Sequence, residues 1–346
     1  MCNIAGYVGS KEATPILLEL IRKQESLSGG YYTGLATLDQ GKIQYAKLTG
    51  NLQRLLDNTN AASFTGNIGI IHSRSKSGGG DEWAHPFVGL KDGEAEIAYV
   101  ANGASGIFNA THREKNNAIV NDLANRGYTF LSRVITDGNS YQTLADGTTI
   151  HMSDGMCQLI LSHMDKGKAP DKAMADAFCE MPSEIVGLTL NRSDPDKIYW
   201  SRINCPMFVA FAPHGVYLAS SPTAFPEDAG EPILLPANSS GYVSADGYTV
   251  APFTNPPAKV ATLNAAVIGK AYQMICNMLT GGEQKPSVLA KEVLPLFMDG
   301  ESIPKYSLVY QILYSLQIQG LLEERIEMVS GAFDGIDAPV SYFRIK

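Results

Sequence analysis

The first nine residues of the chain constrain both its fold and its chemistry. Residues 4–9 are apolar or glycine, a pattern that predicts a short buried strand. If Met1 is removed, Cys2 carries a thiol and a free α-amine, and an α-amine with a pKa of about 8 takes up a proton at neutral pH. Such a thiol has its own base and can act as a nucleophile. If Met1 stays attached, that base is lost. A cysteine that merely follows the start codon is the alternative, and this stretch alone favours it.

The composition indicates a globular protein and argues against binding to nucleic acid or to a membrane. The chain has 346 residues, 45% of them hydrophobic and 18% charged, which is typical of a globular protein with one large and one smaller domain. A net charge of -8 argues against non-specific binding to nucleic acid or to an anionic membrane. No apolar run approaches the roughly 20 residues that cross a bilayer, and the first residues do not resemble a secretion signal. We therefore expect a cytoplasmic protein with no membrane partner.

Cysteine and histidine usage predicts neither disulfides nor a metal site. The five cysteines are odd in number and contain no CxxC pair, which fits a reducing compartment. The histidines at 112, 151, 163 and 214 lack the spacing of metal ligands. We expect no metal and no cofactor.

Periodicity predicts a layered architecture of the α+β or α/β type. Expected helices cover residues 13–24, 51–57, 115–126, 156–166 and 171–180, and expected strands cover residues 31–38, 42–47, 65–72 and 96–100. Strand and turn patterns continue to about residue 250.

Three loops carry candidate binding residues. Arg74 follows a strand and precedes a loop rich in serine and glycine, which suits a carboxylate ligand, although a solvated arginine on a surface loop is the simpler reading. Asn102-Gly103 follows the strand expected at 96–100 and offers amide donors for an oxyanion, although Asn-Gly is also a common hairpin turn. Asp154 precedes an apolar helical run and could bind an ammonium group or cap the helix.

In this order, the motifs resemble the glutaminase domain of class II glutamine amidotransferases. The motifs are Cys2-x-Ile-x-Gly-Tyr, His72-x-Arg74, Ala84-His85-Pro86, Asn102-Gly103 and Ser153-Asp154. This family consists of N-terminal nucleophile hydrolases, and the likeness is greatest to the amidotransferase half of glucosamine-6-phosphate synthase. The resemblance covers about residues 2–250 and implies a four-layer αββα sandwich for residues 1–250.

The resemblance also implies roles for individual residues. Cys2 would attack the side-chain amide of glutamine with its own amine as base, giving a γ-glutamyl thioester and ammonia. Asn102 and Gly103 would stabilise the oxyanion. Arg74 would bind the α-carboxylate and Asp154 the α-ammonium group. Ser77 and His85 complete the substrate-binding set that the resemblance implies.

The chain departs from the family pattern at several of these motifs. Ser75, Ser77 and Gly78 stand where the family often has Trp, Thr and His, so no large aromatic residue covers the substrate there. Ala101 replaces a common histidine, and about 20 extra residues, roughly 132–152, precede Asp154. These differences bear on glutamine specificity, turnover and ammonia channelling more than on the fold.

The residues after 250 do not have the sequence pattern of a synthase domain that uses the released ammonia. Residues 251–258 look like a proline-rich linker, and residues 259–346 predict three helices and a strand pair, which resemble a winged helix. This segment holds eight Lys and Arg against nine Asp and Glu. A DNA-binding module would present a basic face, so we expect a protein–protein or intrachain module and no nucleic-acid partner.

The sequence thus predicts an amidohydrolase or amidotransferase that acts on glutamine or a related small amide. Its architecture leaves room for a separate subunit that accepts ammonia and for a homo-oligomer. The alternative is a catalytically weak or inactive glutamine or amide sensor that acts through its C-terminal domain. A third reading is an amide hydrolase of the same fold with a different substrate.

Overall fold

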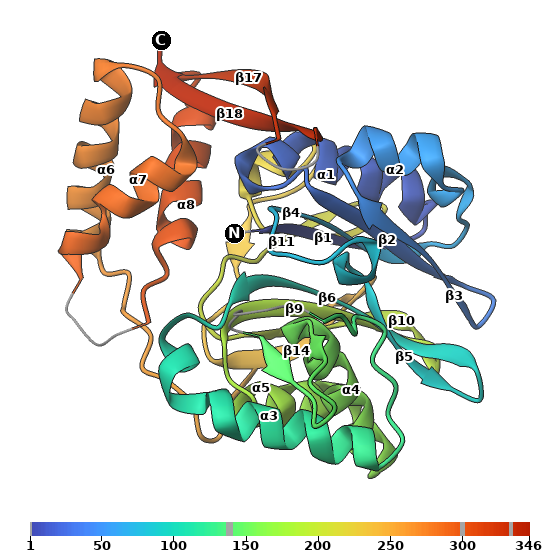
Figure 1. Cartoon of the computed structure of the whole chain (residues 1–346). Helices are drawn as coiled ribbons and strands as arrows, with labels where there is room; N and C mark the ends of the chain where they lie inside the picture. The colour runs from blue at the N-terminus through green and yellow to red at the C-terminus, as the bar shows by residue number, and fades with distance from the viewer. Residues whose placement is uncertain (1, 136–140, 298–301, 332–334) are drawn as a thin grey trace.

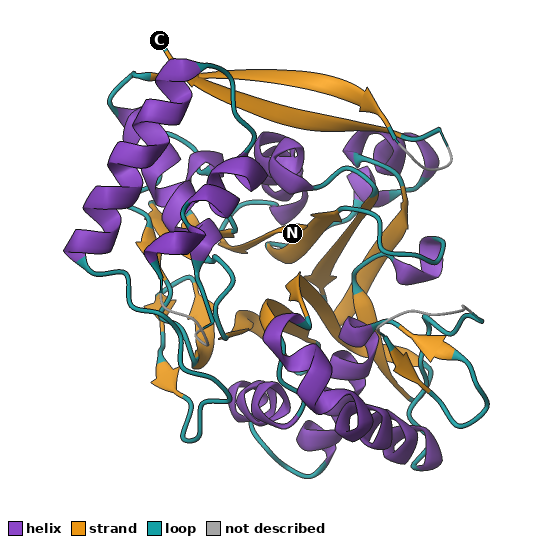
Figure 2. Ribbon diagram, turned by 60° about the vertical axis from the view of Figure 1, so that its left-hand side comes forward, coloured by secondary structure: helices purple, strands orange, loops and turns teal. Residues whose placement is uncertain are grey.

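The computed structural model describes residues 2–135, 141–297, 302–331 and 335–346 (Figure 1). The predicted removal of Met1 therefore lies outside the described residues. Two seven-stranded antiparallel sheets form the centre of the larger domain (Figure 2). The first sheet has the order β13-β11-β12-β1-β4-β2-β3. Its strands are β1 (Cys2–Gly9), β2 (Tyr32–Asp39), β3 (Lys42–Thr49), β4 (Ile68–Arg74), β11 (Phe208–Ala212), β12 (Gly215–Ala219) and β13 (Ile233–Leu234).

The second sheet has the order β15-β14-β10-β9-β6-β5, and β16 also pairs with β14. Its strands are β5 (Phe87–Lys91), β6 (Glu94–Ala104), β9 (Glu184–Asn191), β10 (Asp194–Arg202), β14 (Ser239–Ser244), β15 (Gly247–Tyr248) and β16 (Ala251–Pro252). A two-residue pair, β7 (Gln142–Thr143) and β8 (Thr149–Ile150), lies outside both sheets. The second sheet thus extends into the segment 251–258, where Phe253 is also buried.

Helices cover the outer face of each sheet, so the domain has four layers (Figure 1). The first sheet is covered by α1 (Ala13–Ser28) and α2 (Leu52–Asn58), and the second by α3 (Asn109–Asn125), α4 (Met152–Asp165) and α5 (Pro170–Glu180). The helices expected near these positions are present, because apolar residues recur at helical spacing in each. A mixed helix-and-sheet fold is confirmed.

Strand β1 is buried on both faces, as its apolar run predicted. Ile4 and Val8 belong to the core between the two sheets, whereas Ala5 and Tyr7 pack in the core beneath α1. Successive side chains of a strand point to opposite faces, so one strand supplies both cores. A Cβ atom on Gly6 would lie 3.1 Å from Ile198, which indicates how closely the second sheet approaches.

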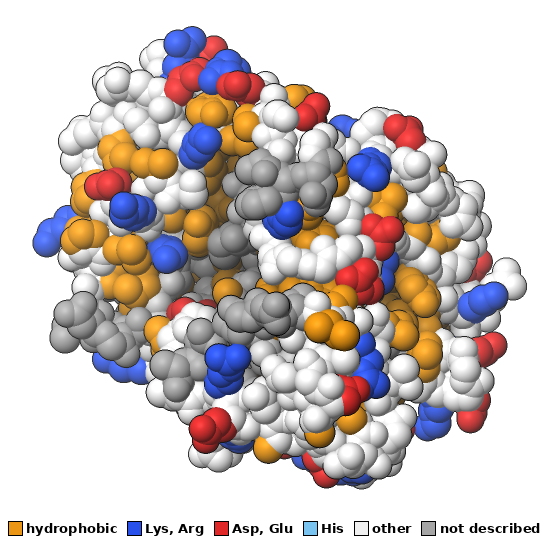
Figure 3. All heavy atoms as spheres, viewed as in Figure 1, with side chains coloured by type: hydrophobic (Ala, Val, Ile, Leu, Met, Phe, Trp, Pro, Cys, Tyr) orange, Lys and Arg blue, Asp and Glu red, His pale blue; other side chains and the backbone are white. Residues whose placement is uncertain are grey.

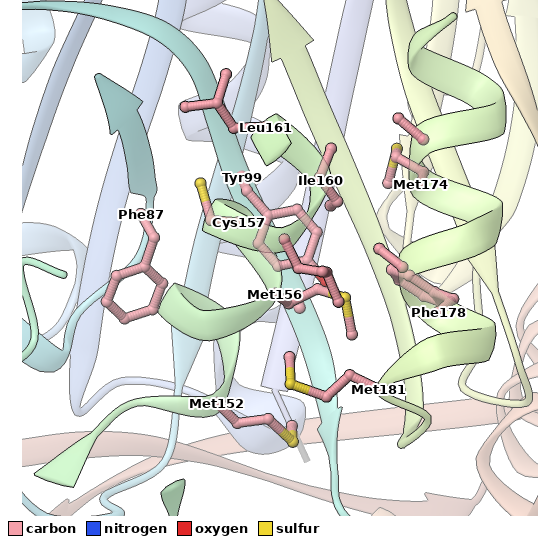
Figure 4. Packing of buried hydrophobic residues seen from close by; sticks show 14 of the residues in the cluster. Phe87, Tyr99, Met152, Met156, Cys157, Ile160, Leu161, Met174, Phe178 and Met181 are labelled. Atoms are coloured by element: carbon pink, nitrogen blue, oxygen red, sulfur yellow. The ribbon is translucent and has the colours of Figure 1, made fainter. Parts of the chain in front are cut away.

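Sulfur and aromatic side chains fill the core between the second sheet and its helices (Figure 4). Met152 and Met156 of α4 lie near Met181, while Tyr99 of β6 and Phe178 of α5 fill the remaining space. Flexible thioethers adapt to irregular gaps between aromatic rings. This packing fixes the start of α4, which borders the site described below.

The C-terminal part contains three helices followed by a hairpin, in the predicted order. They are α6 (Ala265–Gly281), α7 (Pro286–Glu292), α8 (Lys305–Ile318), β17 (Leu322–Ser330) and β18 (Asp337–Ile345). The third helix, α8, packs against the larger domain, with Tyr310 fully buried and Phe208 of β11 in the same core. The hairpin reaches across α1, where Ser341 donates a hydrogen bond to Ser26 (2.6 Å) (Figure 1). The winged-helix assignment and the domain boundaries stay predictions.

The visible face of the molecule carries acidic and basic side chains side by side, with apolar patches over the C-terminal helices (Figure 3). None of the helices in the described ranges is both long and apolar enough to cross a membrane.

Arg202, at the end of β10, joins the two parts of the chain. It is 2% exposed and donates to the carbonyl oxygens of Cys205, Asn204 and Leu235 and to Ser307 Oγ of α8. Burial lowers its pKa to about 10. Among the described residues it has no carboxylate partner, so three carbonyl oxygens and one hydroxyl accept from its donors.

Replacing Arg202 with methionine should lower the free energy of unfolding by at least about 3 kcal/mol. The apolar side chain fills similar space but leaves three buried carbonyl groups without donors, each costing roughly 1–3 kcal/mol. Urea unfolding followed by circular dichroism measures the change. Arg22→Met is the control, since Arg22 pairs with Glu19 on the exposed face of α1, and we expect a loss below about 1 kcal/mol. Equal losses in the two variants would contradict the structural role of Arg202.

Candidate active site

The pairing of β1 with β4 places Cys2 directly opposite Arg74. Cys2 is 7% exposed and Arg74 4% exposed, so both are almost enclosed. The reading of Arg74 as a solvated residue on a surface loop is therefore wrong, because the strand continues through Arg74 and buries its side chain. The predicted reading of Cys2 as the first residue of a rigid strand is confirmed.

The second sheet brings Asn102 to the same place. The His72 Nε2–H group donates to the Ala101 carbonyl (3.1 Å) and so ties β4 to β6 across the sandwich. The Cys2 backbone N–H then donates to Asn102 Oδ1 (2.9 Å), while Asn102 Nδ2 lies 3.4 Å from Ser220 Oγ. Asn102 therefore holds the nitrogen of Cys2 with its oxygen and donates to Ser220 with its amide group, and it is fully buried without bordering the cavity described below.

The predicted end of the strand near residue 100 and the hairpin reading of Asn102-Gly103 are wrong. Strand β6 runs to Ala104, and Gly103 pairs with Ile185 of β9. Gly103 has φ +143°, and a Cβ atom there would lie 2.1 Å from the Glu184 carbonyl oxygen. Only glycine fits this position, which lets the backbone of Gly103 border the cavity.

A cavity of about 90 Å³ opens beside Cys2. Four predicted site residues border it: Cys2, Arg74, His85 and Gly103. The other bordering residues are Ala101, Ala104, Ser105, Tyr141, Gln142, His151, Met152, Ser153 and Ile185. The structure thus brings together a thiol, a guanidinium and backbone amides around one small space.

Arg74 is held in place but keeps unsatisfied donors. Its Nη1 donates to the Trp83 carbonyl (3.2 Å) and lies 2.5 Å from His151 Nε2. The Ser153 amide also donates to His151 Nδ1 (3.1 Å). A neutral imidazole has one acceptor nitrogen, so it serves only one of these two donors. Arg74 Nε has no hydrogen-bond partner among the described residues. The site therefore has guanidinium donors available for an anion.

His85 is buried between other rings. It stacks on His72 with 4.0 Å between ring centroids and meets Phe87 and His151 edge to face. Neither ring nitrogen has a hydrogen-bond partner among the described residues. Burial, reinforced by nearby histidines and Arg74, holds the pKa of His85 well below its usual value, so the ring is neutral.

Asp154 and Ser77 do not border the cavity. Asp154 is fully buried, and its carboxylate accepts from the amide and hydroxyl of Ser132 (2.9 and 2.8 Å) and from Gln158 (3.3 Å). Burial raises its pKa. Ser77 is half-buried, and its hydroxyl has no partner among the described residues. His151, not Asp154, caps α4.

Three cavity residues were not anticipated from the sequence. Tyr141, Gln142 and His151 come from the extra segment near 132–152 and border the cavity. Asn117 and Asn121 of α3 hydrogen-bond to the backbone of Thr143 and so fix β7 (3.0 and 3.1 Å). The length of the insertion was the only sequence signal, and it did not indicate where the segment folds.

A second cavity of about 410 Å³ lies between the larger domain and α8. It shares Gly103 and Ala104 with the first cavity and includes Lys305 and Tyr306 of α8. Ser302 donates to Glu184 (2.7 Å) across this boundary. The C-terminal part thus borders the residues that follow Asn102. Across the described part of the chain, no group of three His, Cys, Asp or Glu residues is arranged to hold a metal ion.

Comparison with known proteins confirms the resemblance to class II glutamine amidotransferases. The glutamine–fructose-6-phosphate aminotransferase (isomerizing) of Pyrococcus horikoshii is 26% identical over 252 residues, which are 72% of this chain and 37% of that protein. The enzyme of the same name from Clostridium perfringens is 30% identical over 252 residues, 72% of this chain and 36% of that protein. The chain therefore matches little more than a third of these relatives. No family profile matches the sequence.

Solved structures share the fold at low sequence identity. The glutamine phosphoribosylpyrophosphate amidotransferase of B. subtilis, in complex with ADP and GMP, has a TM-score of 0.60 at 14% identity and covers 94% of this chain and 66% of that one. The allosteric regulatory enzyme of purine biosynthesis has a TM-score of 0.60 at 15% identity over 81% of this chain and 58% of that one.

Acidification should destabilise the protein through its buried histidines. Burial keeps the pKa of His72, His85 and His151 well below 6.5. Below pH 6.5 the unfolded chain gains protons that the folded chain does not, so each histidine costs up to about 1.4 kcal/mol per pH unit. We expect the thermal unfolding midpoint to fall between pH 7.5 and 5.5.

The variant His72→Gln tests this cause. Burial raises the pKa of Glu25 and Asp154, and these carboxyl groups stabilise the folded state as pH falls, which opposes the histidines. Glutamine retains an amide donor for the Ala101 carbonyl but does not titrate. Its unfolding midpoint should therefore fall less between pH 7.5 and 5.5 than that of the wild type. Parallel curves for the two proteins would show that the histidines do not set this dependence.

Proposed function

We propose that the chain hydrolyses the side-chain amide of glutamine or a related small amide, with Cys2 as nucleophile. The similarity of 72% of the chain to glutamine–fructose-6-phosphate aminotransferases supports this proposal. The observation that carries the proposal is that Cys2, Arg74 and Gly103 border one cavity, while the buried Asn102 of the second sheet accepts a hydrogen bond from the Cys2 nitrogen. A small amide with a carboxylate needs a nucleophile, an oxyanion site and a cation, and each is represented there.

The chemistry begins once Met1 has been removed. The α-amine of Cys2 accepts the thiol proton, directly or through water, and the sulfur attacks the amide carbon. Asn102 Nδ2 and the Gly103 amide stabilise the oxyanion. The carbon–nitrogen bond then breaks, the departing nitrogen takes the proton as ammonia, and a thioester remains on Cys2. Water hydrolyses the thioester to a carboxylate and restores the thiol.

The contact between Cys2 and Asn102 supports this assignment. Asn102 Oδ1 accepts a hydrogen bond from the Cys2 nitrogen (2.9 Å), and this nitrogen becomes the α-amine after processing. The same side chain would therefore orient the base and stabilise the oxyanion. Arg74, with donors that the described residues do not satisfy, would bind the substrate carboxylate. His85, which borders the cavity, would contribute a neutral ring near the bound substrate.

Cys2→Ala should abolish ammonia release from glutamine, because no other group replaces the sulfur. Intact-mass measurement first confirms that Met1 is absent from the protein under test. Cys179→Ala is the control, since Cys179 is a half-buried thiol of α5 outside the cavity, and it should retain the wild-type rate. Ammonia release by Cys2→Ala at the wild-type rate would exclude the proposal.

Asn102→Ala should lower kcat by about 10²–10³, the usual effect of losing one oxyanion donor. Steady-state assays of ammonia release measure kcat and KM. The matched control is Asn58→Ala on α2, which removes an exposed side chain that donates to the Arg54 carbonyl, and we expect its kcat to match the wild type. A normal kcat in Asn102→Ala would remove Asn102 from the mechanism.

A glutamine or amide sensor is the second candidate function. The cavity between the domains favours it, because this cavity shares Gly103 and Ala104 with the Cys2 cavity and includes the start of α8. Ligand binding beside Gly103 would then alter the contact with the C-terminal part. Calorimetric titration that shows tight glutamine binding without ammonia release would select this function over hydrolysis.

We also propose that the C-terminal part is an intrachain packing module and not a nucleic-acid reader. Its third helix is largely buried from Ser307 to Leu316, whereas a recognition helix must be exposed. Any ammonia acceptor would then be a separate molecule or subunit. A cytoplasmic location and self-association are consistent with this proposal.

A further inference from the structure

We propose, on the basis of the proposed amide hydrolysis, that the site takes ω-amides of small carboxylates and does not require an α-ammonium group on them. The residue that faces the α-position would be Gln142, a neutral acceptor, and not a carboxylate. Substrates such as glutaramate (5-amino-5-oxopentanoate), which is glutamine without its amino group, would then be used about as well as glutamine.

The first observation is that Asp154 lies outside the cavity and that three of its roughly four acceptor positions are already occupied. Its Oδ2 accepts two hydrogen bonds from Ser132, and its Oδ1 accepts one from Gln158. The side chain is fully buried and does not border the cavity, although the adjacent Ser153 does. A substrate ammonium group in the cavity could therefore contact Asp154 only if the residues around this carboxylate were rearranged.

The second observation is the charge around the cavity. Among the side chains of the described residues that border it, only that of Arg74 carries a full charge at neutral pH, because the pKa values of His85 and His151 are held well below neutrality. None of these residues is Asp or Glu. An ammonium group placed there loses its hydration and meets a guanidinium of the same sign, which is unfavourable without a carboxylate partner.

The third observation is Gln142 itself. It borders the cavity and is 5% exposed, and its Oε1 has no hydrogen-bond partner among the described residues. Strand pairing with Ile150 and the asparagine contacts from α3 fix its backbone. An unpaired buried acceptor gains from any N–H or O–H donor, charged or not. The cavity therefore offers a substrate one cationic side chain, Arg74, and one neutral acceptor, Gln142.

The test compares ammonia release from glutamine and from glutaramate by the processed wild-type protein. A carboxylate–ammonium contact would favour glutamine by about 10- to 150-fold in kcat/KM, the effect of a hydrogen bond between charged groups. Without that contact, we expect the two kcat/KM values to agree within about fivefold. A preference for glutamine above about tenfold would overturn the inference while leaving amide hydrolysis intact. Ammonia release from neither compound would instead reject the proposed hydrolysis.

Two variants and one control check the roles of Gln142 and Asp154. Gln142→Glu places a carboxylate at the cavity, so the glutamine-to-glutaramate ratio of kcat/KM should rise at least tenfold. Gln44→Glu makes the same change on the surface of β3 and should leave the ratio unchanged. Asp154→Asn should lower both kcat/KM values together, since it disturbs the Ser132 contacts. A fall in the ratio in Asp154→Asn would show that Asp154 binds the ammonium group and would overturn the inference. Because each readout is a ratio within one protein, partial misfolding does not change it.

Discussion

The register between β1 and β4 is the constraint on which the site depends. Cys2 pairs with Arg74, Ile4 with His72 and Gly6 with Ile70. A slip by one residue would turn every side chain of β1 to the opposite face. Ile4 and Val8 would then leave the core between the sheets, so the apolar packing of the strand also fixes the partner of its first residue. Burial of apolar side chains therefore stabilises the register that places the Cys2 thiol beside Arg74.

The second sheet contributes through few but buried polar contacts. The hydrogen bond from His72 to the Ala101 carbonyl aligns β6 with β4, and Asn102 then reaches the nitrogen of Cys2. Close packing of neutral rings around Arg74 leaves its charge without a carboxylate partner in the described residues. In such surroundings a guanidinium attracts an anion strongly.

Much of this arrangement was predictable from local sequence. The apolar run after Cys2, the helical spacing in α1 and the ordered motifs led to the correct strand, helix and family. The position of Asp154 was not predictable, because it depends on hydrogen bonds to Ser132, which lies 22 residues earlier on the far side of an insertion. Tyr141, Gln142 and His151 were missed for the same reason, since no periodicity marks where an irregular segment returns to the domain. The hairpin turn that Asn102-Gly103 predicted is absent. Pairing with β9 holds this dipeptide in an extended strand, although Asn-Gly is typical of turns.

The central place of β1 in its sheet also governs how the domain assembles. Its neighbour on one side is β4, but on the other side it is β12, and the Ile4 amide bonds to Ser220, 216 positions further along the chain. A contact between residues so far apart in the sequence can form only after a large loop has closed. Loop closure costs conformational entropy, which slows folding. Until β12 arrives, one edge of β1 has unpaired backbone groups and invites pairing with other chains. During biosynthesis, the cysteine strand is therefore the segment of this fold that most needs protection from aggregation.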